Sequence, residues 1–331
     1  MKLWKRLTAM LLACALLVCS ACAEEAEIDE QAEIESYNAD DTVLDPTEEV
    51  VFQDTATSEY LDNALAAVNE MQNILLLGID ARPGESTGRS DTMIILTVDA
   101  DANIIRMVSL MRDLYVEIPG YKNNRLNAAY VYGGADLLME TIKVNFGIEV
   151  DCYVGVNFSM LADLIDQIGG LELNVESEYY MDRINAVIKC DNAVLGIDKN
   201  DGLLTESGLQ LMTGKQAQAY ARYRYGTSDG DFGRTQRQRE VILKILEKLR
   251  SKTLIELFKL AGDNIDKVYT NLSIDQIIEL APAALQLENA DVRQMRIPMD
   301  GGYSSQTISG MSVLVPDRTK TKEALAEFYG K

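Results

Sequence analysis

The sequence predicts an α/β layered fold. Apolar runs of strand length, of which "NILLLGID" at 73–80 is the clearest, alternate along the chain with segments of helical periodicity. Strands interleaved with helices build layers around a sheet. A length of 331 residues and a hydrophobic content of 47% supply enough apolar surface for one large domain or two small ones.

The N-terminus has the pattern of an export signal, in which a basic start is followed by an apolar run over 7–18. The letters "SAC" at 20–22 fit a lipoprotein signal, with lipidation expected at Cys22. Cleavage after Ala23 and retention of 1–23 as a membrane anchor are the alternatives. All three place the bulk of the chain outside the cytoplasm, on the outer side of the cell membrane.

An acidic disordered tether is expected over 24–68. The stretch 24–60 contains fourteen Asp or Glu and no Lys or Arg, so it cannot bury enough apolar surface to fold. The domain itself is expected over 69–331, with its core at 73–250. The whole chain has a formal net charge of −21 at pH 7, which argues against nucleic acid as a partner because phosphates repel such a surface.

The elements of the domain are expected in a definite order, set by hydrophobic periodicity and by turn residues. In chain order they are a helix over 61–71, a buried strand over 73–80, two strands within 89–113 around a turn at 99–103, helices over 135–146 and 158–168, a strand over 171–175, an irregular stretch over 177–204, a segment at 207–225 that is helical early and strand-like late, a helix from 234 to about 250, and a tail at 273–331 that ends in a helix.

Composition removes several classes of enzyme. The chain contains no histidine, which excludes Ser-His-Asp and Cys-His catalysis and the commonest zinc ligands. Three of the five cysteines lie in the first 22 residues. Cys152 and Cys190 are expected to be unpaired thiols, with a disulfide between them as the alternative.

Arginines gather at 221–240, "ARYRYGTSDGDFGRTQRQRE", which holds five Arg and no Lys in an acidic chain. Arg222 and Arg224 are two apart in an alternating stretch, so both are expected on one face of a strand. Arg is the residue suited to bidentate gripping of phosphate oxygens. The cluster therefore predicts a site for a compact di- or triphosphate.

The helix after this strand is expected to add to the same site. Arg234 and Gln238 are four apart and continue into the apolar stripe of that helix, so they are expected to face inward near its N-terminus, where free N–H groups favour an anion. Arg237 and Arg239 fall off the stripe and are expected to be surface charges.

Carboxylates and further arginines lie at the ends of the first strands. They are Asp80, Arg89, Asp91, Arg112 and Asp113. Carboxylates beside a phosphate site are useful if they hold a divalent cation, most simply Mg²⁺ with oxygen ligands.

Taken together, these residues resemble the LytR-CpsA-Psr family of Gram-positive cell-envelope enzymes, from about Asn73 to the C-terminus. The matching blocks occur in the family's order: "NILLLGID", "GRSDTMIILTVD", "SLMRDLYVEIPG", "RLNAAYVYGGAD", "VDCYVGVNF", "LIDQIGGLELNV", "LMTGKQAQAYARYRY" and "GDFGRTQRQREVI". The resemblance implies an α/β/α layered domain with a central mixed sheet flanked by helices. It also implies a membrane-anchored, magnesium-dependent phosphotransferase.

The resemblance implies a reaction as well. Such an enzyme takes a glycopolymer, for example a teichoic acid or capsular polysaccharide, from an undecaprenyl-pyrophosphate carrier and transfers it with one phosphate to peptidoglycan. Asp80 and Asp91 would bind Mg²⁺, and Asp231 would orient the arginines. The residues implied to hold the pyrophosphate are Arg89, Arg112, Arg125, Arg222, Arg224, Arg234 and Gln238. Those implied to act in catalysis are Asp91, Arg112, Arg222 and Arg224.

The lipid tail would need an apolar tunnel, for which the helices at 135–146 and 158–168 are candidates. Two other functions remain open. One is a phosphoesterase that uses water as the acceptor, and the other is a non-enzymatic regulator of the envelope.

Overall fold

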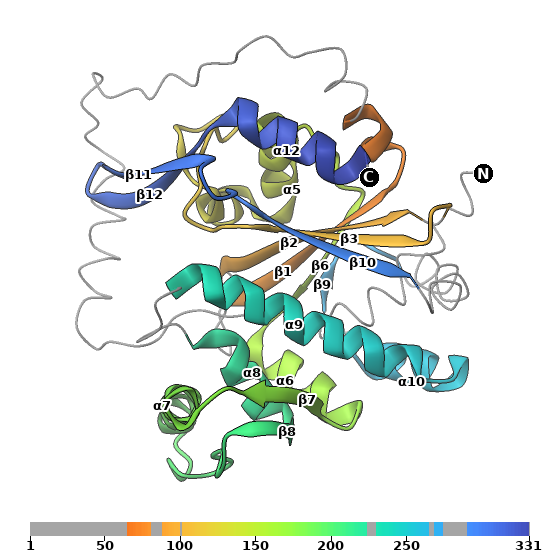
Figure 1. Ribbon diagram of the computed structural model, residues 1–331, viewed down its shortest axis with the longest axis vertical. Helices are drawn as coiled ribbons and strands as arrows, with labels where there is room; N and C mark the ends of the chain where they lie inside the picture. Colours follow the sequence, from red (N-terminus) through yellow and green to blue (C-terminus); the bar gives the residue numbers. More distant parts are fainter. Residues whose placement is uncertain are drawn as a thin grey trace.

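A mixed sheet lies at the centre of the computed structural model (Figure 1). The structure describes residues 65–80, 88–99, 101–223, 230–264, 268–273 and 290–330. Among these, six strands form the sheet in the order β10-β3-β2-β1-β6-β9. Their bounds are β1 Gln72–Asp80, β2 Arg89–Asp99, β3 Ile104–Leu110, β6 Cys152–Val156, β9 Tyr269–Thr270 and β10 Asp291–Ile297.

The pairing within the sheet sets the direction of each strand. β1 pairs in parallel with β6, and β3 pairs in parallel with β10. β2 is antiparallel to both β1 and β3, so β1, β3, β6 and β10 all run the same way. Their carboxyl ends consequently lie along one edge of the sheet.

Helices cover both faces of the sheet, as expected for an α/β/α domain (Figure 1). The helices are α5 Leu126–Phe146, α6 Phe158–Gln167, α7 Glu178–Val194, α8 Gly214–Arg222, α9 Gly230–Arg250, α10 Leu254–Asn264 and α12 Arg318–Gly330. In the described residues, three two-stranded sheets complete the fold: β4 Tyr115–Val116 with β5 Asn124–Arg125, β7 Leu171–Val175 with β8 Gly208–Met212, and the β11–β12 hairpin, Tyr303–Ile308 with Met311–Pro316.

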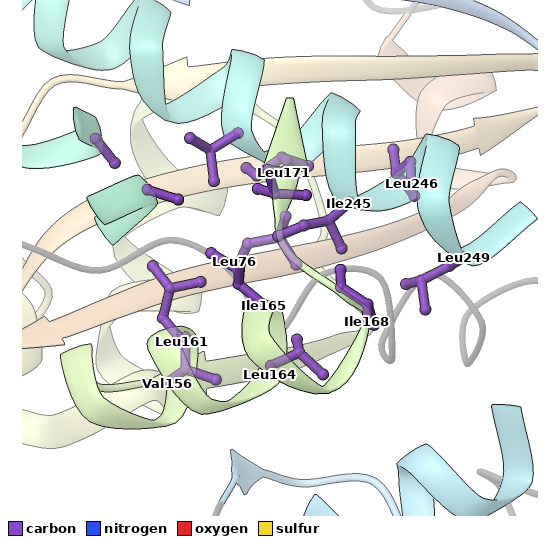
Figure 2. Packing of buried hydrophobic residues seen from close by; sticks show 14 of the residues in the cluster. Leu76, Val156, Leu161, Leu164, Ile165, Ile168, Leu171, Ile245, Leu246 and Leu249 are labelled. Atoms are coloured by element: carbon purple, nitrogen blue, oxygen red, sulfur yellow. The ribbon is translucent and has the colours of Figure 1, made fainter. Parts of the chain in front are cut away.

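Alternation along the strands divides the core in two. Ile74 and Leu76 point into the cluster formed with α6, α8 and α9, which Figure 2 shows from close by. Leu75 and Leu77 point into the cluster formed with α5 and α12. Successive side chains of a strand face opposite sides, so an apolar run such as 73–80 fits a sheet that is covered on both faces.

α5 starts earlier than the helix expected over 135–146. Its axis is interrupted by two non-helical glycines, and Gly134 has φ of 67°. Glycine tolerates this left-handed backbone without the steric cost that a Cβ brings. The helix expected over 135–146 is the part of α5 after these glycines, and the part before them, from Leu126, was not predicted.

The stretch over 177–204, which the sequence predicts to be irregular, contains the 17-residue helix α7, so this prediction was wrong. The buried face of α7 includes Asn185 and Asn192 as well as isoleucines. Asn185 Nδ2 donates to Leu204 O at 3.0 Å, and Asn192 Nδ2 donates to Asp201 O at 2.8 Å. Buried asparagines satisfied by the following loop do not count as apolar positions, so the helical stripe was hidden.

α8 packs unusually close to α6. A Cβ on Gly214, the first residue of α8, would lie 1.9 Å from Ala162 O of α6. The N–H of Gly214 donates to Asp166 Oδ1 at 2.7 Å. A side chain at this position has no space, so the glycine sets how α8 enters the domain.

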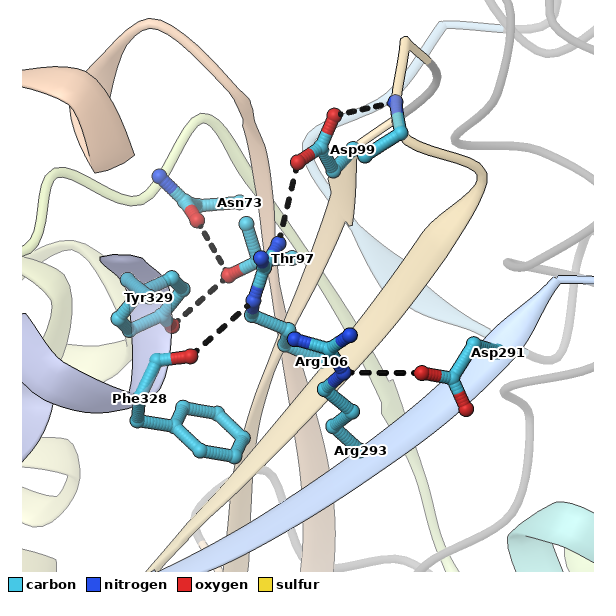
Figure 3. Close-up of polar contacts among 9 residues, drawn as sticks. Asn73, Thr97, Asp99, Arg106, Asp291, Arg293, Phe328 and Tyr329 are labelled. Atoms are coloured by element: carbon cyan, nitrogen blue, oxygen red, sulfur yellow. Dashed lines mark hydrogen bonds and ion pairs between the residues drawn. The ribbon is translucent and has the colours of Figure 1, made fainter. Parts of the chain in front are cut away.

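The C-terminal helix is fixed to the sheet by polar contacts (Figure 3). Thr97 Oγ1 on β2 donates to Asn73 Oδ1 on β1 at 2.6 Å and lies 2.9 Å from the hydroxyl of Tyr329. Arg106 of β3 donates to Phe328 O at 3.3 Å and pairs with Asp99 at 3.2 Å. Burial raises the pKa of Tyr329 to about 12, so this phenol stays protonated and can act as a donor.

Candidate functional site

The candidate site lies at the sheet edge where β1, β3, β6 and β10 end. Ligands of open α/β sheets bind outside the carboxyl ends of their strands. Arg112 follows β3, and its carbonyl accepts a hydrogen bond from Asn127 in the first turn of α5 at 3.3 Å. The first turn of α9 contributes Asp231, so two helices begin beside these strand ends.

Five charged side chains form a row of ion pairs at this edge. Arg234 Nη2 lies 2.9 Å from Asp231 Oδ2, and Arg112 Nε lies 3.7 Å from the same oxygen. Arg112 Nε also lies 3.7 Å from Asp113 Oδ2. Asp113 Oδ1 in turn lies 3.5 Å from Arg125 Nε. We call Arg125, Asp113, Arg112, Asp231 and Arg234 the ion-pair row.

Asp91 joins this row from β2. Its Oδ2 lies 3.1 Å from Arg112 Nη1, and its side chain is 2% exposed. With Asp91 counted, three carboxylates balance three guanidinium groups. A phosphate that binds here must therefore displace the carboxylates from the arginines, or bind together with a cation that offsets its charge.

A β-bulge explains how Asp91 reaches Arg112. The register between β1 and β2 shifts so that Gly78 opposes Thr92 and Ile79 opposes Ser90, which leaves Asp91 without a partner residue on β1. Bulges bend a strand and re-aim its side chains, and they are frequent beside active sites. The bulge cannot be read from the alternation of the sequence.

The carboxylate of Asp91 has capacity left for a cation. Its Oδ1 is buried and has no hydrogen-bond partner among the described residues. Within the same part of the chain, no three His, Cys, Asp or Glu residues gather as a metal site. One or two carboxylates completed by substrate phosphates are the usual ligand set for Mg²⁺, so the residues present fit that ion.

The placement expected for the start of α9 is confirmed for Arg234 and Gln238, which are each 1% exposed. The surface position expected for Arg237 was wrong. Arg237 is 7% exposed, its Cζ lies 3.8 Å from the ring centroid of Tyr223, and its Nη2 donates to Tyr223 O. Because α8 packs beside α9, a residue off the sheet-facing stripe is also buried.

Arg239 is not a simple surface charge either. Its Nη1 donates to Ser109 Oγ of β3 at 2.8 Å, and its Nε donates to Gln294 Oε1 of β10 at 3.0 Å. These contacts tie the middle of α9 to the sheet. The apolar stripe alone does not show them, because both partners are polar.

Arg222 does not lie on a strand, as the alternation predicted, but is the last residue of α8. Its Nη1 lies 2.8 Å and 2.6 Å from the two carboxylate oxygens of Asp191 on α7. A capping box at Thr213 starts a helix here that overrides the alternating pattern. The structure links Arg222 to α7, and its role in holding phosphate stays a prediction.

The other expected site residues are placed in part. Arg89 starts β2, where it is half-buried and opposes Asp80 at the end of β1. Arg224 and Cys22 lie outside the described residues, as does the side chain of Asp80. The roles expected for these residues stay predictions.

The helices proposed to line one lipid tunnel lie on opposite faces of the sheet. Leu161 and Ile165 of α6 belong to the cluster on the α9 side, whereas Leu138 and Ile142 of α5 belong to the cluster on the α12 side. The two helices therefore do not face a common space, and a role for either one in lining a tunnel stays a prediction. In the described part of the chain, no helix is both long and apolar enough to cross a membrane.

The C-terminal part of the chain borders the site, which sequence reasoning missed. Arg296 Cζ of β10 lies 4.0 Å from the ring centroid of Phe232, the residue after Asp231. The ring of Tyr303 on β11 lies 5.9 Å from the same ring. Arg125 Nη2 donates to Ser312 O of β12 at 2.9 Å. No local pattern joins residues so far apart in sequence.

Cys152 and Cys190 are not joined in a disulfide, as expected. Cys152 is buried and Cys190 is half-buried. Burial, with a smaller contribution from Asp151, raises the pKa of Cys152 to about 12. The thiol of Cys152 is therefore structural, and neither cysteine belongs to the ion-pair row.

Comparison with known proteins gives consistent matches. A model of the LytR_cpsA_psr family matches residues 30–328. A relative in Enterococcus faecalis, named polyisoprenyl-teichoic acid–peptidoglycan teichoic acid transferase TagU, is 34% identical over 245 residues, which are 72% of each chain. Regulatory protein MsrR of Staphylococcus aureus strain COL is 30% identical over 260 residues, 77% of this chain and 73% of that one.

A solved structure extends the comparison to a ligand. The structure described as family protein YwtF (TagT) with bound octaprenyl pyrophosphate lipid superposes with a TM-score of 0.57 at 26% identity. It covers 79% of this chain and 91% of the other. A similar protein with this fold therefore binds a polyprenyl pyrophosphate.

Proposed function

The chain belongs to the LytR-CpsA-Psr family, and from this premise we propose that it transfers a glycopolymer from a polyprenyl-pyrophosphate carrier to peptidoglycan. The observation that carries the proposal is the ion-pair row at the carboxyl edge of the sheet. It gathers guanidinium groups from three separate segments of the chain at one sheet edge, which supports a site for a compact anion. Undecaprenyl pyrophosphate is the carrier we propose, and teichoic acid is the better supported of the polymers.

The reaction is a phosphoryl transfer. An acceptor hydroxyl on peptidoglycan forms a bond to the phosphorus that carries the polymer, and the bond from that phosphorus to the bridging oxygen breaks. The polymer keeps one phosphate, polyprenyl phosphate leaves, and the hydroxyl proton is released. Arg112 and Arg234 would neutralise the charge that develops on the leaving phosphate, because preorganised donors act most strongly on such charge.

The carboxylates of the row would hold the arginines in place until substrate arrives. Asp231 contacts both Arg112 and Arg234 through one oxygen, so it keeps the two guanidinium groups a fixed distance apart. Positioning of this kind removes reorganisation from the reaction step. Arg89, Arg125, Arg222, Arg224 and Gln238 are proposed to complete the grip on the pyrophosphate.

Mg²⁺ is the proposed cofactor, held by Asp91 and Asp80. The buried Oδ1 of Asp91 supports this because it lacks a hydrogen-bond partner in the described residues. When bound, the ion would neutralise negative charge on the phosphates. Calorimetry should detect weak Mg²⁺ binding to the protein alone and tighter binding when a polyprenyl pyrophosphate is present, with both lost in Asp91→Asn.

We propose further that the protein works at the outer face of the cell membrane of a Gram-positive bacterium. Support comes from the export signal and from a polymer acceptor that belongs to the cell wall. Lipidation of Cys22 is the proposed anchor. Cells fed a clickable palmitate analogue should label the wild type and not Cys22→Ala; equal labelling would favour cleavage after Ala23 or a retained anchor.

The transfer itself is tested with a synthetic polyprenyl-pyrophosphate-linked disaccharide and peptidoglycan fragments. Arg112→Lys should lower the transfer rate by about 10²–10³, because a point charge does not replace a fork-shaped donor in the row. Arg293→Ala is the control, since Arg293 pairs with Asp291 at the far end of the sheet and is half-buried. Transfer at the wild-type rate by Arg112→Lys would show that the row is not the phosphate site.

Product analysis separates the alternatives. Release of the sugar phosphate into water, with none joined to peptidoglycan, would indicate a phosphoesterase. The name of MsrR favours regulation as a second candidate function. A wild-type protein that binds the lipid pyrophosphate but turns over neither substrate would support that second candidate.

A further inference from the structure

The β11–β12 hairpin stands out by its composition. Residues 301–316, "GGYSSQTISGMSVLVP", contain no charged side chain, although 25% of the whole chain is charged. Asp300 and Asp317 flank this uncharged stretch. Exposed segments of an acidic protein normally carry charge, so its absence here needs a physical reason.

The hairpin lies along the ion-pair row. At one end, the ring of Tyr303 is 5.9 Å from the ring of Phe232, which follows Asp231. At the other end, Ser312 O accepts from Arg125 Nη2 at 2.9 Å, and Ser312 is the partner of Thr307 on β11. Leu314 N donates to Asp113 O at 2.9 Å between these two points. β12 therefore borders the row at Asp113 and Arg125, and β11 reaches it at Tyr303, beside Phe232.

The hairpin presents polar groups outward. Ile308 and Val313 are buried against Tyr115 and fix the hairpin to the domain. Ser304, Ser305, Gln306 and Thr307 are all exposed. In the described part of the chain, β11 pairs only with β12, so one edge of the strand is open. Because successive side chains of a strand face opposite sides, Ser304 and Gln306 lie on one side of β11 and Ser305 and Thr307 on the other, so both sides of the strand carry hydroxyl or amide groups.

We infer that this hairpin is the platform for the acceptor, a neutral glycan chain of peptidoglycan. The inference rests on the transferase function proposed above and names where its second substrate lies. Hydroxyl and amide groups both donate and accept, which matches the hydroxyl and N-acetyl groups of sugars. They also lose less on desolvation than charged groups would.

The charge of the donor polymer decides against it as the occupant. A teichoic acid carries phosphates, and a surface that binds it would gain from Lys or Arg. None of the exposed side chains of β11 is a Lys or an Arg. A glycan lying along β11 would reach the ion-pair row at Tyr303, whose ring lies 5.9 Å from the ring of Phe232, the residue after Asp231.

The test measures the dependence of transfer on acceptor concentration, with glycan oligosaccharides prepared from peptidoglycan. The triple variant Ser305→Ala/Gln306→Ala/Thr307→Ala should raise the acceptor KM about tenfold, since several modest hydrogen bonds are lost. The donor KM and the rise in Tm caused by polyprenyl pyrophosphate should stay at wild-type values. Asn174→Ala is the matched control, because Asn174 is an exposed amide on β7, in the two-stranded β7–β8 sheet.

Introducing a charge of either sign at Gln306 identifies the molecule that occupies the hairpin. If it is a neutral glycan, Gln306→Glu and Gln306→Lys should both weaken acceptor binding. A Lys variant that binds polymer more tightly, with a Glu variant that binds it less tightly, would assign the hairpin to the anionic donor and overturn the inference. An unchanged acceptor KM in the triple variant would overturn it as well.

Failure of the proposed function can be told apart from failure of this inference. Co-sedimentation with purified, polymer-free peptidoglycan measures glycan binding without any transfer. Wild type should sediment, as should Arg112→Lys, whereas the triple variant should remain in solution. If wild type transfers nothing but this pattern holds, the hairpin still binds glycan; if all three proteins behave alike, the hairpin is not the platform.

Discussion

Replacing Asp231 by Asn tests the ion-pair row through two effects of opposite sign. Asp231 Oδ2 lies 2.9 Å from Arg234 Nη2 and 3.7 Å from Arg112 Nε, so one carboxylate serves two guanidinium groups. Breaking a buried ion pair typically lowers the free energy of unfolding by about 3–5 kcal/mol. The side chain of Asp231 is 22% exposed and Asn keeps an acceptor oxygen, so we expect about 1–2 kcal/mol. For a domain of this size the Tm should fall by roughly 2–8 °C.

Inorganic pyrophosphate should then bind the variant more tightly than the wild type. The anion no longer faces the carboxylate, and removal of one repulsive charge nearby is worth on the order of 1–2 kcal/mol. That corresponds to about tenfold in Kd. At equal pyrophosphate concentration the Tm of Asp231→Asn should therefore rise by more than that of the wild type. Turnover should nevertheless fall, because Arg112 and Arg234 lose the group that fixes their spacing.

The assay is thermal unfolding with and without pyrophosphate, read beside the transfer rate. Asp291→Asn is the control, because Asp291 pairs with Arg293 at the same 2.9 Å but is 62% exposed. It should change the Tm by less than about 2 °C and leave the response to pyrophosphate unaltered. A smaller pyrophosphate response in Asp231→Asn than in the wild type would refute the view that the row is where phosphate binds.

Three other expectations concern the framework. Tyr329→Phe should lower the free energy of unfolding in urea by about 1 kcal/mol, because Thr97 keeps its hydrogen bond to β1. Thr97→Val should lower it by about 2–4 kcal/mol, because two buried polar groups are then left unpaired. Equal costs would contradict this assignment of donors. Cys190 should react with a maleimide at pH 8 well before Cys152, whose pKa is raised to about 12 by burial; similar rates would contradict the buried placement. Arg237→Lys should destabilise the protein by about 1–2 kcal/mol, since the stacked guanidinium is lost, and a neutral effect would restore the view of a surface charge.

The sequence predicted the layered fold because the buried strands are almost purely apolar. Ile74 to Leu77 alternate between two cores, and only a sheet covered on both faces needs apolar side chains at every position. Elements whose buried faces contain polar residues were harder to recognise. α7 was missed for this reason, since Asn185 and Asn192 occupy its buried stripe.

The site was predictable in residue type more than in geometry. Arg234 and Gln238 were placed correctly because helical spacing links them to an apolar stripe. Arg222 was misplaced because a helix cap overrode alternation, and its partner Asp191 lies 31 positions away. The β-bulge at Asp91 has no signature in a single sequence, because it depends on how two strands pair.

The contact between the first strands and the last helix affects the order in which this protein can fold. Thr97 and Tyr329 are 232 positions apart, yet their hydroxyl groups meet in the core. In a chain that emerges N-terminus first, α5 can cover part of this face of β1 and β2, and the rest stays uncovered until the final helix arrives. Contacts of such separation are slow to form, and the exposed intermediate is vulnerable to aggregation and proteolysis. Loss of the last few residues would therefore act on folding yield before it acted on the site.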